Sequence, residues 1–223
     1  MTNLSEKILG EDVSIDVDGR TLDACLDIPA MARGFVIFAH GSGSGRFSPR
    51  NRYVAGVLNA YGFGTLLADL LTPTEAALDS RTGHLRFDIG FLARRLDGLA
   101  DWACGQEATR GLPLGLFGAS TGAAAALEVA AQRQDIAAVV SRGGRPDLAM
   151  PVLDLVTAPV LLIVGSRDLQ VLEWNRMAKA RLKVPASLSI IAAAGHLFEE
   201  PGTLEAAAAE AAKWFGKYLP AHG

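Results

Sequence analysis

A serine lies between two glycines where an apolar run meets a helical pattern of small residues. The run 114–117 breaks at Gly118-Ala119-Ser120-Thr121-Gly122, and an alanine-rich segment follows at once. This order predicts a strand, a sharp turn and a helix, with Ser120 at the apex in a strained backbone conformation that exposes its hydroxyl. Alone, the pattern also fits an ordinary glycine-rich turn, so the rest of the chain must decide between the two.

Composition sets the broad class of protein. The chain has 223 residues, 50% hydrophobic and 20% charged, which predicts one globular α/β domain over residues 1–223. The net charge of −3, with no basic block, argues against a nucleic-acid partner. The apolar runs are too short for a membrane span or a signal peptide, and the two cysteines lack CxxC spacing. We therefore expect no membrane partner and a cytoplasmic location.

Hydrophobic patterning predicts a largely parallel sheet. An antiparallel hairpin (13–17 and 22–28) precedes apolar runs that are mostly separated by helical segments, which is typical of a sheet covered by helices on both faces. We expect about eight strands. Residues 72–79 are interpreted as a loop, and 142–159 receive no assignment. The further expected strands are 34–39, 64–68, 114–117, 136–141, 160–164 and 187–192, and the expected helices are 48–62, 85–102, 121–132, 172–182 and 203–219.

Four of the predicted strands end in residues that carry chemistry. These ends hold His40-Gly41-Ser42-Gly43, Ser120, Asp168 and His196. The carboxyl ends of parallel strands meet at one edge of a sheet, where ligands bind. The chain order serine, acid, histidine is that of an α/β-hydrolase triad. Among the four histidines, His196 is the one that follows the final strand, so it is the candidate base.

The chemistry requires each of these groups. His196 would accept the proton of the Ser120 hydroxyl, and Asp168 would orient the imidazole and stabilise its charged form. The tetrahedral oxyanion needs preorganised donors, and the backbone amides of Thr121 and Ser42 are the candidates. Neither a metal nor a cofactor is expected.

Structural interpretations remain open for each group. Asp168 could be a helix N-cap, and His196 could be a surface loop residue. Asp147 also follows a strand end, but it lies beyond Pro146 in a loop of uncertain course. The run Gly41–Gly45 could cradle phosphate, yet it lacks the Lys-Ser/Thr ending of a P-loop.

These motifs together resemble a known family. His40-Gly-Ser-Gly43, Gly118-Ala-Ser-Thr-Gly122, Gly165-Ser-Arg-Asp168 and Gly195-His-Leu-Phe-Glu-Glu-Pro201 are similar to those of compact bacterial α/β-hydrolases of the dienelactone hydrolase-like group. The resemblance runs from Phe35 to Phe215. It implies an α/β-hydrolase fold and acyl transfer to water. The best-known dienelactone hydrolases use a cysteine nucleophile, whereas this sequence resembles relatives with serine. Some relatives carry an attached phosphoribosyltransferase-like domain, for which these residues contain no sequence.

Only residues 142–159 separate two strands at the position where many α/β-hydrolases insert a lid, so we expect no lid domain and an open pocket. An open pocket favours small substrates. Gly41, Arg142 and Arg145 are candidate substrate-binding residues, the arginines as a fork for an anionic group. A solvated turn is the alternative for both arginines.

The leading hypothesis is a cofactor-independent hydrolase of small carboxylic esters or lactones. An acyltransferase or perhydrolase on the same triad is an alternative, and so is a non-catalytic binding protein with this fold. The expected partner is a small-molecule ester or lactone. A monomer and a homodimer both remain open.

Overall fold

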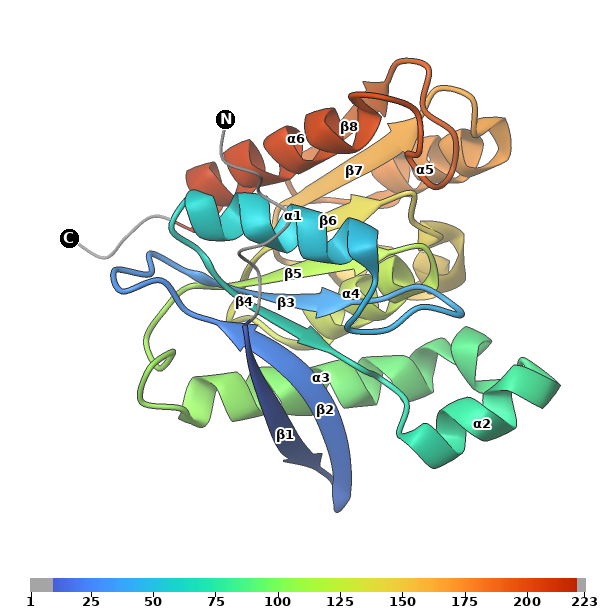
Figure 1. Cartoon of the computed structure of the whole chain (residues 1–223). Coiled ribbons are helices and arrows are strands. Elements are labelled where there is room, and N and C mark those ends of the chain that lie inside the picture. Colours follow the sequence, from blue (N-terminus) through green and yellow to red (C-terminus); the bar gives the residue numbers. More distant parts are fainter. Residues whose placement is uncertain (1–9, 220–223) are drawn as a thin grey trace.

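The computed structural model describes residues 10–219, which are built on one eight-stranded sheet in the order β1-β2-β4-β3-β5-β6-β7-β8 (Figure 1). The strands coincide with the apolar runs of the sequence, so the expected α/β-hydrolase architecture is confirmed. They are β1 (Glu11–Val17), β2 (Arg20–Asp27), β3 (Phe35–Ala39), β4 (Gly64–Ala68), β5 (Leu114–Ala119), β6 (Ile136–Arg142), β7 (Val160–Gly165) and β8 (Ala186–Ile191).

The sheet has an antiparallel edge and a parallel body. The pairs β1–β2 and β2–β4 are antiparallel, whereas every pair from β4 through β3 to β8 is parallel. The hairpin turns at Asp18 and Gly19, both with positive φ. The central strands β3 to β7 are buried along nearly their whole length, as parallel strands covered on both faces must be.

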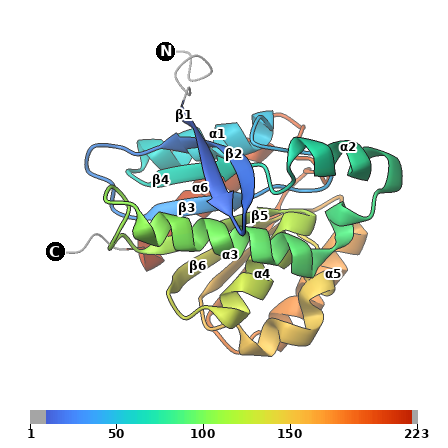
Figure 2. The same cartoon turned by 90° about the horizontal axis from the view of Figure 1, so that it is seen from below.

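Helices cover the two faces of the sheet (Figure 2). On one face α1 and α6 pack over a core that includes Phe38, Phe117 and Phe215. On the other face α3, α4 and α5 enclose a second core with Leu96, Leu116 and Leu127. The helices are α1 (Pro49–Ala60), α2 (Pro73–Thr82), α3 (Ile89–Gly105), α4 (Thr121–Gln132), α5 (Leu169–Arg181) and α6 (Thr203–Tyr218), with 3₁₀ segments η2 (Leu85–Phe87) and η3 (Pro146–Leu155).

The connections reverse direction at the centre of the sheet. From β3 the chain proceeds to β4 on one side, and from β5 it proceeds through β6 and β7 to β8 on the other. The register pairs Ala39 with Gly118, so the carboxyl ends of β3 and β5 are adjacent. This is the topological switch point of an open α/β sheet, where ligands bind.

The structure corrects the expectation of a loop at residues 72–79, because α2 begins there. Thr72 caps this helix and accepts from the amide of Glu75, whose side chain in turn accepts from the amide of Thr72 at 2.8 Å. These two hydrogen bonds form a capping box, and Pro73 occupies the first helical position. The Thr-Pro-x-Glu spacing in the sequence is typical of this motif. The helix has no apolar stripe, which is why hydrophobic periodicity missed it. The unassigned segment 142–159 contains η3 rather than an inserted lid.

No helix in the described part of the chain combines the length and apolar character needed to cross a membrane.

Candidate active site

Ser120 lies at a strained turn between β5 and α4. Its backbone angles are φ 52° and ψ −122°, a combination that costs free energy in a residue with a side chain. The glycines on either side allow close packing: a Cβ on Gly118 would collide with the backbone of Ala123, and one on Gly122 would collide with the carbonyl of Ala39. The turn can therefore form only with glycine at both positions, as the sequence motif indicated.

The segment after β6 holds this turn in place through its backbone. The Ser120 amide donates to the Arg142 carbonyl at 3.3 Å, and the Arg145 amide donates to the Ser120 carbonyl at 3.0 Å. Between them, Gly143 has φ 51° and lies against His196, since a Cβ there would be 3.1 Å from the His196 carbonyl oxygen. The ends of β5 and β6 and the histidine loop therefore converge.

Asp168 and His196 are in direct contact. The Asp168 Oδ2 atom lies 2.6 Å from the His196 Nδ1 atom. Asp168 does occupy the N-cap position of α5, but its side chain makes no capping hydrogen bond. The carboxylate is therefore directed to the imidazole instead of the helix. With Nδ1 engaged, Nε2 is the ring nitrogen left to exchange a proton with a nucleophile.

The loop that carries His196 is fixed by two further contacts. The Gly195 amide donates to both carboxylate oxygens of Glu200 at 3.0 Å, and this contact lowers the pKa of Glu200. A Cβ on Gly165 would collide with the carbonyls of Ala194 and Gly195, so the end of β7 and the loop pack backbone to backbone. These contacts bring Asp168 and His196 to adjacent strand ends.

The two candidate oxyanion donors flank the serine. The Thr121 amide begins α4, and the Ser42 amide lies in the turn after β3; within residues 10–219 neither donates to a protein acceptor. A Cβ on Gly41 would lie 2.9 Å from the Ser120 Cβ, so only glycine lets this turn approach the serine. The turn is anchored by His40, whose Nδ1 hydrogen-bonds the Gly41 carbonyl at 3.0 Å.

Two cavities meet at Ser42. The first, which we call the Ser120 cleft, has a volume of about 250 Å³. It contains both the serine and the histidine of the candidate triad. Among its lining residues are Ser42, Ser120, Arg142, Gly143, His196 and Leu197.

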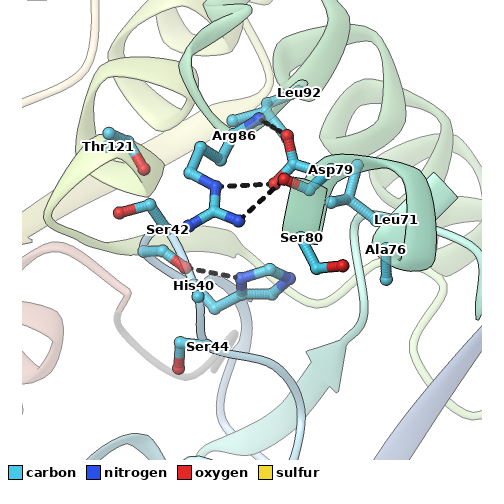
Figure 3. Close-up of a pocket in the computed structure, with 12 residues that line it drawn as sticks. His40, Ser42, Ser44, Leu71, Ala76, Asp79, Ser80, Arg86, Leu92 and Thr121 are labelled. Carbon is cyan, nitrogen blue, oxygen red and sulfur yellow. Dashed lines mark hydrogen bonds and ion pairs between the residues drawn. The ribbon is translucent and has the colours of Figure 1, made fainter. Parts of the chain in front are cut away.

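The second cavity, which we call the α2 chamber, lies on the other side of Ser42 and has about 260 Å³. Figure 3 shows Arg86 between Asp79 and Ser42, where its Nε donates to the Asp79 Oδ2 at 2.6 Å. Burial opposes the ionisation of Asp79, but the donors of Arg86 and the Leu85 amide outweigh it and lower its pKa. The chamber is mainly apolar, and its walls include His40, Ser42, Leu71, Ala76, Leu92 and Thr121.

The structure separates the two arginines that the sequence grouped. Arg142 is buried and lines the Ser120 cleft, where its Nη2 donates to the Asn51 Oδ1 at 3.0 Å. Arg145 forms a two-point pair with Asp147, at 2.9 and 2.8 Å, and lies over the ring of Trp174. Arg145 does not line the Ser120 cleft, and Asp147 is occupied by this pair rather than by a histidine.

Sequence reasoning overlooked Asn51. This residue is 3% exposed and lies in the first turn of α1. It follows the capping residue Ser48 by three positions. That spacing places Asn51 in the first turn of the helix, and the sequence gives no other indication of its position. A polar residue in the first turn of a helix is ordinary, so its contact with Arg142 required the fold.

Solved structures of similar fold support the same architecture. No family model matches the chain. A dienelactone hydrolase from Anabaena variabilis is 54% identical and superposes with a TM-score of 0.92, covering 95% of this chain and 99% of its own. An esterase domain from Rhodothermus marinus has a TM-score of 0.75 at 17% identity, over 94% and 98% of the two chains. The latter likeness concerns the fold alone.

The curated relatives are longer proteins. Two Mycobacterium tuberculosis proteins, provisionally named phosphoribosyl transferases, are 54% identical over 195 residues. The match takes in 87% of this chain but 43% of each relative, so more than half of each relative lies outside it. The chain belongs to the dienelactone hydrolase family of α/β-hydrolases.

Proposed function

We propose that this chain is a serine hydrolase that cleaves small carboxylic esters or lactones through an acyl-enzyme intermediate. The observation that carries the proposal is the 2.6 Å contact between Asp168 and His196 beside a cleft that Ser120 also lines. An acid, a base and a half-buried serine that lines the cleft, at three strand ends, are the parts that acyl transfer requires.

In the proposed reaction, Ser120 Oγ attacks the ester carbonyl while His196 Nε2 accepts its proton. The carbonyl electrons move to oxygen, and the Ser42 and Thr121 amides would donate to this oxyanion. Collapse of the intermediate expels the alcohol, which takes the proton from His196. A water molecule then repeats the cycle on the acyl-enzyme, releases the acid and restores Ser120. Each oxyanion donor of this kind contributes roughly 3 kcal/mol to the barrier reduction.

The transferase name of the curated relatives does not change this proposal, because it describes proteins of which this chain matches 43%. Transfer of the acyl group to an acceptor other than water would use the same residues. An ester panel with and without added alcohol or peroxide separates these outcomes.

A fluorophosphonate probe tests the proposal directly. We expect the wild-type chain to be labelled and to hydrolyse 4-nitrophenyl acetate, and we expect Ser120→Ala to abolish both. Ser187→Ala, an exposed serine on the edge strand β8, is the control and should keep its labelling. Labelling that persists in folded Ser120→Ala protein would refute the serine-hydrolase proposal.

A further inference from the structure

Arg142 is a buried cation without a counter-ion in the described part of the chain. The residue is 7% exposed; among the described residues its guanidinium hydrogen-bonds only the neutral Asn51 amide, and its Nη1 has no hydrogen-bond partner. Burial, with the nearby charge of Arg50, lowers the pKa of Arg142 to about 10. The group therefore stays charged at neutral pH. An uncompensated buried charge costs free energy, and an anion bound in the cleft that Arg142 lines would reduce that cost.

The fixed charges that line the cleft around Arg142 are cationic. Among residues 10–219, the Ser120 cleft is lined by two arginines, Arg142 and Arg50, and by no carboxylate. In the described part of the chain, the one ion pair of Arg50 is with Glu199, at 3.4 Å and with Glu199 exposed, which is a weak pairing. The first turn of α1 contains no acidic residue, so its positive helix end faces no opposing charge of its own.

The cleft also holds neutral hydrogen-bond donors, and we refer to these donors together with Arg142 and Arg50 as one wall of the cleft. Ser44 and Ser48 line the cleft, and Ser48 is the N-cap of α1, where its hydroxyl accepts from the Asn51 backbone amide and keeps its own proton to donate. Because the Asn51 Oδ1 accepts from Arg142, the Asn51 amide nitrogen is left as a donor. The cleft thus combines two guanidinium groups, two hydroxyls and a side-chain amide beside Ser120 and His196.

We propose that this wall of the Ser120 cleft binds a phosphate group carried by the substrate, so that the preferred substrate is a carboxylic ester that bears a phosphate monoester. The inference rests on the proposed function, because the bond that breaks is still the carboxylic ester. The phosphate remains intact and orients the carbonyl toward Ser120.

Charge and donor number favour phosphate over carboxylate as this handle. A phosphate monoester carries close to two negative charges at neutral pH and offers three terminal oxygens. These match the two arginines and the separate hydroxyl and amide donors. A carboxylate has one charge and two oxygens, so it offers fewer acceptors and less charge to these donors.

Calorimetric titration of Ser120→Ala protein with inorganic phosphate tests the site without relying on catalysis. At low salt and pH 7.5, we expect saturable binding of phosphate and at least tenfold weaker binding of acetate. Absent phosphate binding, or acetate binding as tight as phosphate, would overturn the inference.

Variants assign the binding to the wall. Inorganic phosphate should inhibit hydrolysis of 4-nitrophenyl acetate competitively, and Arg142→Met should raise its inhibition constant at least tenfold. Arg145→Met, which alters the arginine paired with Asp147, is the matched control and should leave that constant unchanged. If Arg142→Met does not fold, Arg50→Gln replaces it with an expected rise of at least threefold, and an unchanged constant in either folded variant refutes the site.

Failure of the two proposals can be told apart. Wild-type protein that does not hydrolyse any neutral ester contradicts the proposed function, whatever the calorimetry gives. Protein that hydrolyses neutral esters but neither binds phosphate nor prefers a phosphorylated ester over its neutral analogue contradicts only this inference.

Discussion

The Nε2 atom of His40 accepts a hydrogen bond from the backbone amide of Leu70 at 3.0 Å. Since Nδ1 engages the Gly41 carbonyl, the imidazole is the neutral tautomer with its proton on Nδ1. His40 follows β3 and Leu70 follows β4, so one buried ring ties two strand ends together and supports the turn that contains Ser42. His40 is thus a positioning residue of the candidate oxyanion hole.

This contact predicts a loss of stability in mild acid. Burial lowers the pKa of His40 from 6.5, so the unfolded chain binds a proton there before the folded chain does. The free energy of unfolding should therefore be fully retained above pH 6.5 and should fall as the pH drops below it, by up to about 1.4 kcal/mol per pH unit. Denaturant titrations between pH 5 and 8 measure this slope.

Two histidine variants isolate the effect. His40→Gln should flatten the slope between pH 5 and 6.5, and His84→Gln, at an exposed position, should preserve it. An identical slope in wild type and His40→Gln would contradict the assignment.

The second prediction concerns the acid of the candidate triad. Asp168→Asn should lower kcat by about 10⁴-fold, because the amide cannot hold the imidazole in its working tautomer or stabilise its positive charge. Asp147→Asn serves as the matched control. It breaks only the pair with Arg145 and should change kcat by less than threefold. Steady-state kinetics on a neutral ester decide the question, and a crippling effect of Asp147→Asn would reverse the assignment.

The third prediction concerns acyl-chain length. The α2 chamber has about 260 Å³, so it accommodates a short chain, and each methylene buried there is worth roughly 0.8 kcal/mol. Specificity constants should rise from acetyl to butyryl esters and then stop rising, with decanoyl esters disfavoured.

Filling the chamber tests where the chain binds. Ala76→Trp should abolish the gain of butyryl over acetyl esters, because Ala76 lines the chamber. Ala77→Trp places the same bulk one residue away on α2, outside the chamber lining, and should keep the gain. Equal effects of the two variants would show that the acyl chain binds elsewhere.

Much of the architecture was predictable because buried parallel strands leave a strong local signal. The runs at β3, β4, β5 and β7 are continuous and apolar, so the existence of these strands and their positions along the chain follow from the sequence alone. The glycine positions around Ser120 were also predictable, since the turn admits nothing larger. Local chemistry dominates at these places.

Features that depend on contacts distant in sequence were not predictable. The pairing of Arg142 with Asn51 joins residues 91 positions apart, and nothing in either neighbourhood announces it. The sequence favoured Asp168 over Asp147 as the acid because Asp147 lies beyond Pro146, but the contact of Asp168 with His196 and the pairing of Asp147 with Arg145 are visible only in the fold. The α2 helix was missed for a different reason: its signal is the capping box at Thr72, not an apolar stripe.

The position of α2 has a consequence for the evolution of this chain. The segment that walls one side of the chamber is an excursion between β4 and α3, anchored by the Asp79–Arg86 pair and by Glu75 bonded to Arg95 at 2.9 Å. None of the candidate triad residues lies on it. If the acyl chain binds in the chamber as predicted above, residues 73–84 can diversify, lengthen or be exchanged while these anchors hold, and selectivity can change without rebuilding the reactive centre.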